Sequence, residues 1–445
     1  MIPTASNYWL KNAQIPLCLV SQEAISVTPN REGLGLIDLK ISSGVITQIV
    51  PAGSLDITET PVIDLKKRQV WPCFVDLHTH LDKGHVWERS PNPDGTFQAA
   101  IETIGKDQTH WNAEEIYRRM EFGLKCSYAQ GTKAIRTHLD SGGKLADLSW
   151  DVFKSLQQEW SDRLILQAAS LVTLEDYLTP AGEKLADKIA EFGGVLGGVA
   201  YMNPNIDQQI DQVFTLAKER GLDLDLHTDE NDDLNSITLR KVAETAVRHQ
   251  FSGQIICGHC CSLSVQPLED VNYTLNLVQQ AGIGIVSLPM CNLYLQGRNY
   301  QKNSTTTCTP TWRGITLLHE LKQREIPVAV ASDNCRDPFY GFGDHDALEV
   351  FKMAVRIAHL DHPYEDWPNI VTQTPANLMR LSSVGRIGIG LPADLIIFRG
   401  RSFSELLSRS QHDRIVLRKG QKIETELPDY AELDDLVHSD QVGES

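Results

Sequence analysis

The sequence predicts an α/β protein: a (β/α)8 TIM barrel with a small β-sandwich domain that both chain ends form. Eight short apolar stretches alternate with amphipathic helical stretches between residues 69 and 382. No Gly-x-Gly-x-x-Gly fingerprint follows any of them, which argues against a dinucleotide-binding sheet. Short β-type runs with Gly and Pro between them lie before residue 69 and again over residues 383–427.

The composition narrows the class of protein. A chain of 445 residues has room for a barrel and a satellite domain. Its formal net charge of −17 would repel the negatively charged phosphates of a nucleic acid, so we expect no nucleic-acid partner. No apolar run approaches the ~20 residues of a membrane helix, and no secretory signal opens the chain, so we expect a cytoplasmic protein without a membrane partner. The nine cysteines indicate reduced thiols.

The N-terminal part, residues 1–68, contains β-rich runs at residues 36–41 and 45–50 and shows no helical period, which favours a small antiparallel sheet. Each barrel strand is then predicted from a short buried apolar run with a helical stretch after it. These strands are residues 70–78, 133–137, 164–171, 195–201, 222–227, 254–259, 283–288 and 328–333.

The chain after the barrel returns to β-type sequence. Residues 383–427 contain short runs with Gly turns, and we expect them to pair with the N-terminal runs of residues 1–68. Residues 428–445 are acidic and contain no lysine or arginine, so we expect a disordered tail there.

Metal-capable or proton-transferring side chains end four of the eight predicted strands: they are His78 and His80, His227, His259 and Asp333. His78 and His80 are two residues apart on a strand and point to the same face, so both can reach one ion. Glu230 follows three residues after His227. Barrel chemistry lies at the C-terminal ends of the strands, so we expect these side chains to meet.

The residue types indicate hydrolysis assisted by one divalent metal ion, Fe²⁺ or Zn²⁺. The predicted ligands are His78, His80, His227 and Asp333, with one position left for water. Such an ion lowers the pKa of its water toward neutrality. An imine-like ring carbon needs its neighbouring nitrogen protonated, and Glu230 is the candidate acid. His259 would hold or deprotonate the water, so Glu230, His259 and Asp333 are the predicted catalytic residues.

The order of these motifs resembles that of the amidohydrolase superfamily, and the local sequences are similar to those of bacterial cytosine deaminases. The similar stretches lie between about residues 40 and 425: they are residues 74–82, 136–140, 227–230, 292–298 and 313–316. The His-x-His pair is generic, whereas Leu-Gln-Gly-Arg at residues 295–298 is more specific. The resemblance implies a barrel with a β-sandwich domain, one iron or zinc ion, and hydrolytic loss of ammonia from an amino-substituted ring.

The sequence also departs from the cytosine deaminases. Thr173 lies near the position of their glutamine that reads the pyrimidine amide edge, and Asn334 and Phe339 replace an aspartate and a tryptophan. His-Thr-His-Leu-Asp-Lys83 and Ser-Asp-Asn-x-Arg-Asp resemble instead hydrolases that remove alkylamines from triazine rings. Lys83, Thr173, Asn334 and Phe339 are therefore the predicted substrate-binding residues.

These features predict deamination of a free amino-substituted nitrogen heterocycle. The predicted substrate is cytosine or a close analogue. The alternative substrate is another cyclic amidine or an aminotriazine. The expected partner is this small molecule, and a homo-oligomer is possible. Lys83 could instead pair with Asp82 or Asp94 on the rim and never meet the substrate.

Other interpretations stay open. Cys257-Gly-His-Cys260 matches the Cys-x-x-Cys of thiol–disulfide oxidoreductases. A barrel that binds no ion would be a non-catalytic binding protein, which metal analysis distinguishes from an enzyme.

Four further residues could line the cavity or serve only the fold. His138 and Asp140 could line the cavity or only fix the end of the second strand. Gln296 and Arg298 could contact the substrate or only anchor a loop.

Overall fold

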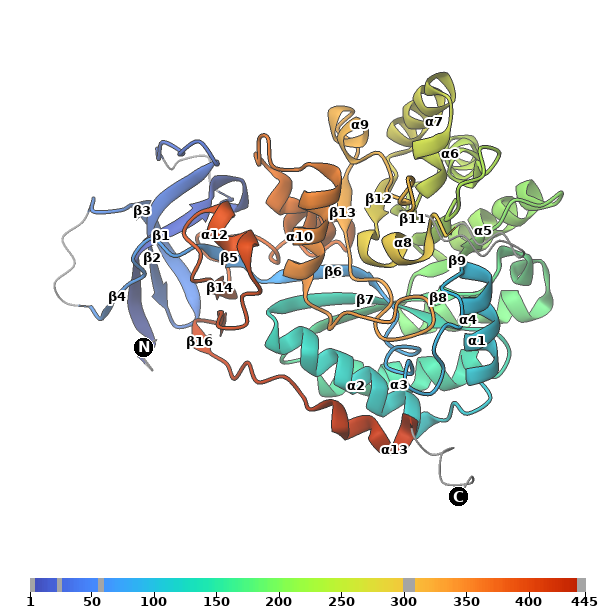
Figure 1. The fold of residues 1–445 in the computed structure, drawn as a ribbon, viewed down its shortest axis with the longest axis horizontal. Helices are drawn as coiled ribbons and strands as arrows, with labels where there is room; N and C mark the ends of the chain where they lie inside the picture. Colours follow the sequence, from blue (N-terminus) through green and yellow to red (C-terminus); the bar gives the residue numbers. More distant parts are fainter. Residues whose placement is uncertain (1–4, 22–25, 55–59, 299–308, 438–445) are drawn as a thin grey trace. The chain divides into compact units, whose positions relative to one another are not determined.

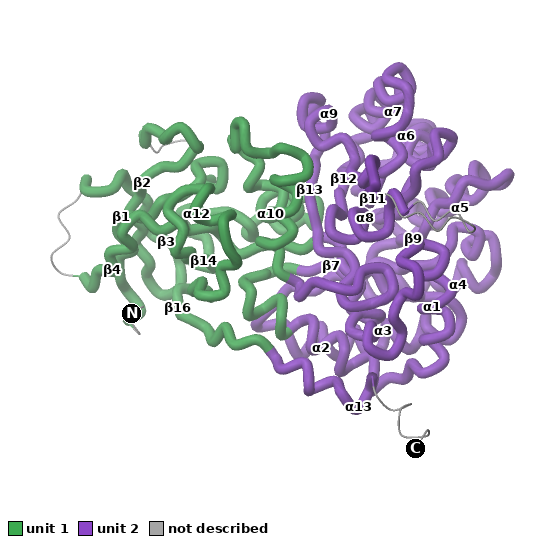
Figure 2. Tube along the Cα trace, in the orientation of Figure 1, with its two compact units in different colours: residues 1–76, 125–134, 346–427 green, residues 77–124, 135–345, 428–445 purple. Residues whose placement is uncertain are grey.

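The computed structural model describes residues 5–21, 26–54, 60–298 and 309–437 (Figure 1). The chain divides into two compact units, which Figure 2 colours separately. The first unit contains residues 1–76, 125–134 and 346–427, and the second contains residues 77–124, 135–345 and 428–445. Residues 346–382, which we expected in the barrel, therefore cluster with the first unit.

The first unit contains two four-stranded sheets, with strand orders β3-β2-β1-β4 and β16-β15-β14-β5. The strands are β1 (Asn7–Pro16), β2 (Leu34–Ser42), β3 (Val45–Pro51), β4 (Val62–Asp64), β5 (Val70–Pro72), β14 (Leu395–Ile397), β15 (Ile415–Arg418) and β16 (Gln421–Lys422). The helical elements are η1 (Leu17–Leu19), α10 (Ala347–Ala358), η4 (Trp367–Val371), α11 (Gln373–Leu378) and α12 (Phe403–Ser408).

One apolar cluster in the first unit contains side chains from both chain ends. Leu10 and Leu39 come from the N-terminal strands, and Leu395 and Leu417 come from the C-terminal strands. The Ala393 amide also donates a 2.8 Å hydrogen bond to the carbonyl of Gly44. A shared core and shared main-chain hydrogen bonds therefore hold the two ends together.

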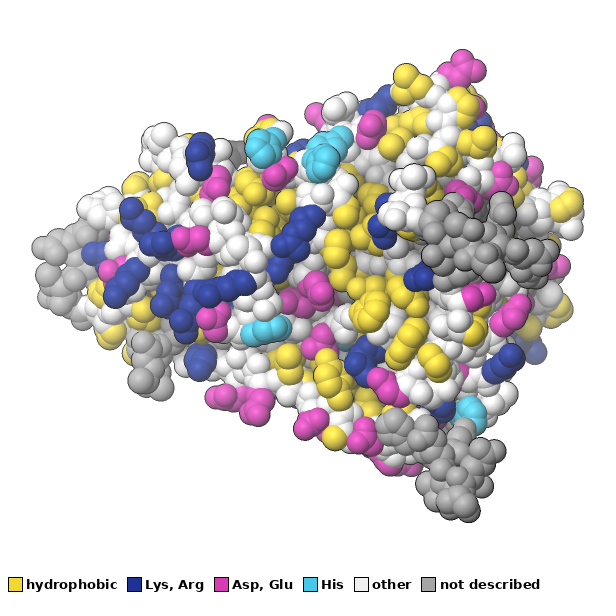
Figure 3. All heavy atoms as spheres, in the orientation of Figure 1, with side chains coloured by type: hydrophobic (Ala, Val, Ile, Leu, Met, Phe, Trp, Pro, Cys, Tyr) yellow, Lys and Arg dark blue, Asp and Glu magenta, His cyan; other side chains and the backbone are white. Residues whose placement is uncertain are grey.

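Basic side chains are unevenly distributed on the face that Figure 3 shows. Lysine and arginine side chains gather there over the first unit, whereas acidic, basic and apolar side chains alternate over the second. On this face, the basic side chains are therefore distributed unevenly between the two units, although the net charge of the chain is −17.

The eight strands predicted for the barrel are present, and all eight end within three residues of the expected position. They are β6 (Phe74–Thr79), β7 (Thr132–Asp140), β8 (Ile165–Leu171), β9 (Leu196–Ala200), β10 (Leu224–Thr228), β11 (Ile255–His259), β12 (Gly284–Ser287) and β13 (Val328–Val330). The expected strand at residues 70–78 is two strands, because Pro72 has no amide donor and ends β5. The next amide, that of Cys73, donates to Asp394 in the first unit.

These strands form a mixed α/β fold with parallel pairing. β9 to β13 form a five-stranded parallel sheet in sequence order, and β6, β7 and β8 form a second sheet. Isolated parallel bridges join Thr173 to Val199 and Thr79 to Asp333, so β8 neighbours β9 and the end of β6 neighbours the segment after β13. The end of β6, the first of these strands, therefore lies beside the segment that follows β13, the last.

The helices of the second unit lie between consecutive strands, and α4, α5, α6 and α7 each pack against the next (Figure 1). They are α1 (Phe97–Asp107), α2 (Ala113–Ala129), α3 (Leu145–Glu159), η2 (Leu174–Leu178), α4 (Pro180–Phe192), α5 (Ile206–Arg220), α6 (Thr238–His249), η3 (Cys261–Val265), α7 (Leu268–Ala281), α8 (Pro289–Leu295) and α9 (Leu318–Gln323). In the described ranges no helix has the length and apolarity needed to cross a bilayer.

Local sequence signals set the helix ends. α4 begins with Pro180 after Thr179, whose hydroxyl accepts a 3.2 Å hydrogen bond from the Gly182 amide. α4 and α5 end at Gly193 and Gly221, which have φ angles of 65° and 63°. Such sharp ends return the chain to the next strand and keep the loops short.

Part of the expected disordered tail is ordered, in η5 (Tyr430–Leu433) and α13 (Asp434–Val437). The Arg118 guanidinium donates to both carboxylate oxygens of Asp435 at 2.6 and 2.7 Å, and Arg89 Nη1 donates to the carbonyl of Leu436 at 2.7 Å. The expectation of disorder is wrong here because basic side chains of the second unit hold this acidic segment. Residues 438–445 lie outside the described ranges.

Candidate active site

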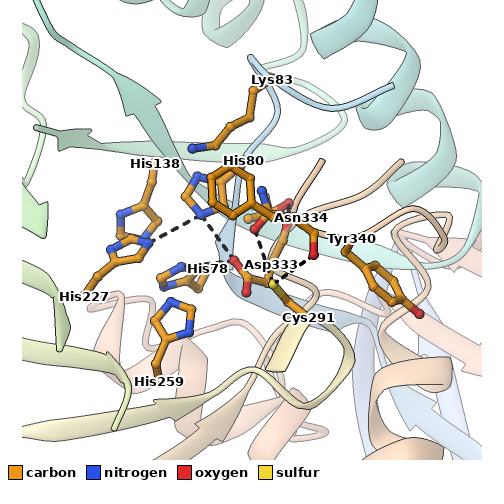
Figure 4. A network of polar contacts seen from close by, with 12 residues as sticks. His78, His80, Lys83, His138, His227, His259, Cys291, Asp333, Asn334 and Tyr340 are labelled. Atoms are coloured by element: carbon orange, nitrogen blue, oxygen red, sulfur yellow. Dashed lines mark hydrogen bonds and ion pairs between the residues drawn. The ribbon is translucent and has the colours of Figure 1, made fainter. Parts of the chain in front are cut away.

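The four side chains expected to bind the ion converge at the ends of β6 and β10 and just after β13 (Figure 4). His227 Nε2 lies 3.4 Å from His80 Nε2, and His80 Nε2 lies 3.2 Å from Asp333 Oδ1. His78 Nε2 lies 3.6 Å from the same oxygen. Two nitrogens bound to one ion at ~2.0–2.1 Å in tetrahedral geometry would lie about 3.3 Å apart. The donor set therefore fits one divalent ion.

The protonation state of the histidines also suits an ion. Burial, together with other imidazoles and Lys83 nearby, lowers the pKa of His78, His80 and His227 well below 6.5. The rings are therefore neutral at physiological pH and have a lone pair to donate. Both ring nitrogens of His78 are buried and have no hydrogen-bond partner among the described residues. An ion would supply the missing partner.

The backbone holds Asp333 against β6. Asp333 has a left-handed φ of 63°, which is uncommon for a residue with a side chain. Its amide donates to the carbonyl of His78 at 2.9 Å, and the His80 amide donates to the carbonyl of Asp333 at 3.3 Å. These two hydrogen bonds fix the carboxylate between the two histidines.

Glu230, His259 and Asn292 form a second group beside the ligands. His259 Nδ1 lies 3.2 Å from Glu230 Oε1, and Asn292 Nδ2 lies 3.2 Å from the same oxygen and 3.1 Å from the ring nitrogen. Burial, followed by repulsion from Asp333, raises the pKa of Glu230 well above 4.5. Burial lowers the pKa of His259 to about 3. Of the two groups, the carboxyl is therefore the one whose protonated form is favoured, and the ring is neutral.

A cavity of about 70 Å³ opens onto both groups. Its lining residues are His80, Lys83, Phe97, Ile101, Leu171, Val199, Tyr201, His227, Glu230, His259, Asp333, Asn334 and Phe339. Apolar and aromatic walls with a polar, metal-capable floor suit a flat heterocycle.

Lys83 faces this cavity and does not pair with Asp82 or Asp94 on the rim. Its Nζ lies 3.1 Å from Asp140 Oδ1 and 5.2 Å from the centre of the Phe339 ring. Burial opposes the charge of Lys83, but Asp140 and the neighbouring carboxylates outweigh it and raise the pKa of the amine. The rim pairing is wrong because Asp140, at the end of the adjacent strand, is the nearer acid.

Thr173 does not line the cavity, contrary to the prediction. Its side chain is exposed and donates a 2.8 Å hydrogen bond to Asp176 Oδ2 at the start of η2. Leu171, two residues earlier, supplies the wall instead. The predicted position fails because the strand ends before Thr173 and the chain turns outward.

Asn334 and Phe339, which we expected from the resemblance to bind substrate, lie in the cavity wall. Asn334 Nδ2 donates to Asp337 Oδ2 at 2.7 Å, which fixes the amide. The Asp337 carboxylate also accepts from the Phe339 amide at 2.8 Å. Asp337 therefore organises this loop, although it does not line the cavity.

His138 lies against the ligands but does not line the cavity. Its ring centre is 4.0 Å from that of His78, and Asp225 Oδ1 is 3.7 Å from its Nε2. Arg136 Nη1 donates to Asp225 Oδ2 at 2.8 Å, so the carboxylate beside the His138 ring belongs to a buried ion pair. His138, His78 and His227 also form a possible metal group.

Sequence reasoning missed some residues of the site. Asn292 lies in a motif that was recognised only by resemblance. Phe97 begins α1 and Tyr201 follows β9, and neither has a chemical signature in the sequence. Gln296 donates to the carbonyl of Glu230 at 3.1 Å, and Arg298 Nε donates to the carbonyl of Tyr294 at 2.7 Å, so both anchor loops.

The Cys-x-x-Cys segment lacks the features of a redox site. Burial raises the pKa of Cys257 well above 9 and that of Cys260 similarly, so both are protonated thiols. A reactive cysteine needs an exposed thiolate. None of the eight cysteines in the described residues forms a disulfide.

Comparison with known proteins identifies relatives. Residues 146–421 match the model of the amidohydrolase family. The chain is 46% identical over 438 residues to a pterin deaminase of Rhizobium rhizogenes strain K84, covering 98% of each chain. It is 23% identical over 355 residues to N-isopropylammelide isopropyl amidohydrolase of Pseudomonas sp. strain ADP, covering 76% of this chain and 82% of that one. A structure of 5-methylcytosine deaminase from Klebsiella pneumoniae has a TM-score of 0.78 at 24% identity, covering 93% and 97%, and shows the similarity of fold.

Proposed function

Since this chain belongs to the amidohydrolase family, we propose that it is a metal-dependent hydrolase that removes the exocyclic amine of a pterin-type ring as ammonia. The observation that carries the proposal is the buried Glu230 carboxyl, whose pKa burial raises, beside a metal-capable cluster within one cavity. Similarity to a pterin deaminase over almost the whole chain supports a bicyclic amino-oxo ring as the substrate. A pterin therefore replaces cytosine as the proposed substrate, and cytosine serves as the substrate for comparison.

His78, His80, His227 and Asp333 would hold one divalent ion, zinc or iron. Bound there, the ion would lower the pKa of a water molecule toward neutrality and so supply the nucleophile. The histidines are already neutral and the carboxylate already faces them, so the site needs little rearrangement to accept the ion.

Glu230 delivers the proton that activates the ring. When water oxygen bonds to the carbon that bears the amine, the adjacent ring nitrogen takes the proton from the Glu230 carboxyl. The carbon–nitrogen bond to the amine then breaks. One proton of the former water goes to the amine, which leaves as ammonia, and the other returns to the Glu230 carboxylate. The sum is pterin plus water to the dioxo ring plus ammonia.

His259 and Asn292 orient this acid. His259 Nδ1 and Asn292 Nδ2 both contact Glu230 Oε1 at 3.2 Å, so the second carboxyl oxygen is left to face the ring. His259 Nε2 has no hydrogen-bond partner in the described residues and is available to the water. Such fixed donors stabilise charge that develops during the reaction.

Lys83 and Phe339 bind the ring. The buried ammonium of Lys83 lies over the Phe339 ring, so a flat heterocycle that enters here meets a cation and an aromatic face together. Carbonyl oxygens and ring nitrogens of a pterin accept hydrogen bonds, which suits an ammonium donor. Asn334 supplies a second polar group on the same wall.

The fold proposal has two parts. We infer that β6 to β13 close into one (β/α)8 barrel, because bridges link β8 with β9 and Thr79 with Asp333. We also infer that the two four-stranded sheets of the first unit pack as a β-sandwich, because one apolar cluster contains residues of both.

A substrate screen tests the function. Ammonia release would be measured for pterin, cytosine and an aminotriazine, with protein loaded with zinc or with iron. The proposal expects the highest kcat/KM for pterin and no turnover by metal-free protein. Equal or higher kcat/KM for cytosine would overturn the pterin assignment, and release of an alkylamine in place of ammonia would overturn deamination.

A further inference from the structure

A second group of metal-capable side chains lies in the second unit and has no role in the reaction above. Its members are His85, Cys335 and His345, and each is at most 3% exposed. One ligand atom from each lies within 4.8 Å of the other two. The three residues come from the loop after β6, the loop after β13 and the segment before α10.

The distances suit a tetrahedral ion. The Nε2 atoms of His85 and His345 are 3.2 Å apart. Two nitrogens at ~2.0–2.1 Å from one ion would be about 3.3 Å apart in tetrahedral geometry. One thiolate and two imidazoles form a ligand set that selects zinc, and cobalt in its place. Burial lowers the pKa of His85 well below 6.5 and that of His345 to about 4, so both rings are neutral donors.

The backbone is bent to bring the three side chains together. His85 and His345 have left-handed φ angles of 62° and 54°, an uncommon conformation for residues with a side chain. The His85 amide donates to the carbonyl of Cys335 at 3.0 Å, which fixes the two loops side by side. A Cβ at Gly123 would lie 3.0 Å from His345 Nε2, so the glycine leaves space beside that nitrogen.

The surrounding charges do not prevent binding of a cation. Arg336 is paired with Glu88. Arg119 Nε lies 3.3 Å from Glu115 Oε1. Each of these guanidinium groups near His85 is therefore balanced by a carboxylate.

We propose that His85, Cys335 and His345 bind a second divalent transition-metal ion, of the zinc type. Burial raises the pKa of the Cys335 thiol well above 9, as it does for Cys257, so this thiol is protonated without an ion. Binding forms one sulfur–metal bond and breaks the S–H bond of Cys335, whose proton goes to solvent, with no change of oxidation state. A cavity of about 90 Å³ adjoins His85 and Tyr430, so a water molecule can approach this ligand. The ion joins the loop that carries Lys83 to the loop that carries Asn334, and so stiffens two walls of the candidate active site.

Cobalt(II) tests the proposal, because a cobalt–thiolate bond gives an intense near-ultraviolet charge-transfer band that histidine and carboxylate ligands do not give. The metal-free full chain would be titrated with Co²⁺, and absorbance and bound cobalt would be measured together. The proposal expects two Co²⁺ per chain and the thiolate band. Titration without this band would overturn it.

Variants assign the band to the site. In Cys335→Ser one Co²⁺ and the band should be lost, whereas Cys126→Ser, which removes another buried thiol, should keep both. His345→Gln, which removes a different ligand, should lose the same ion. Circular dichroism checks that each variant is folded. His80→Ala should lose the other ion and keep the band, so failure of this proposal is distinguishable from failure of the proposed function. A band that survives in folded Cys335→Ser or His345→Gln would contradict the assignment.

Discussion

His259 Nδ1 lies 3.2 Å from Glu230 Oε1, and burial shifts the pKa values of the two side chains in opposite directions. The pKa of the carboxyl is raised well above 4.5, and that of the imidazole is lowered to about 3. Both shifts favour the state in which the carboxyl holds the proton and the ring is neutral. A buried acid that keeps its proton at neutral pH can donate that proton to a substrate nitrogen.

Glu230→Gln should keep the ion and lose the chemistry. Glutamine preserves the size and much of the hydrogen bonding with Asn292 but cannot deliver a proton, so kcat should fall by the ~10²–10⁴ of a lost general acid. Steady-state ammonia release and metal analysis measure the two effects. Glu175→Gln, at an exposed acid of η2, is the matched control. A near-normal kcat would show that Glu230 is not the general acid and has only a structural role in its loop.

His80→Ala should lose the active-site ion. His80 Nε2 lies between His227 Nε2 and Asp333 Oδ1, so its removal leaves three protein ligands for a metal of borderline softness. Mass spectrometry of desalted protein should show one ion fewer per chain than in the wild type. His110→Ala, at an exposed histidine, should show no change. Unchanged metal content in folded His80→Ala would refute the ligand set.

Lys83→Met should raise KM for pterin and leave the metal content unchanged. The substitution keeps most of the apolar stem over Phe339 and removes a buried donor, which costs ~1–3 kcal/mol or about a ten- to hundred-fold increase in KM. Lys144→Met, at an exposed lysine, serves as the control, and the melting temperature reports whether loss of the pair with Asp140 destabilises the fold. Unchanged KM for every substrate would place Lys83 outside the binding site.

Asp337 should make folding stability depend on pH. Burial raises its pKa from 3.8 to about 6 in the folded chain. Between these pH values the unfolded chain loses this proton and the folded chain keeps it, so this group's contribution to stability falls as pH rises from about 4 to 6. The free energy of unfolding in urea, measured at both ends of this range, should fall more in the wild type than in Asp337→Asn. An equal fall in the two proteins would show that Asp337 does not titrate in this range.

The strands, and the metal-capable side chains at their ends, were predictable because they depend on local patterns. Each of the eight strands is a short apolar run, and the spacing of His78 and His80 places both on one face. The order of the remaining acids and histidines along the chain then placed them at strand ends. Periodicity and side-chain chemistry are properties that a single sequence carries.

The contacts around the ligands were not predictable, because they join distant segments. Lys83 and Asp140 are 57 residues apart, and His85 and His345 are 260 apart. Thr173 was misplaced because one loop turn decides whether a side chain faces the cavity or solvent. Such details depend on the path of the loops, which composition and periodicity do not encode.

The most direct test of the account is hydrolysis of pterin by the zinc-loaded enzyme in water enriched in oxygen-18. The account predicts that each product ring carries one oxygen-18 at the carbon that held the amine, with one ammonia released per product, as measured by mass spectrometry and an ammonia assay. Product without the label, or ring turnover without an equal amount of ammonia, would contradict hydrolytic deamination at this site.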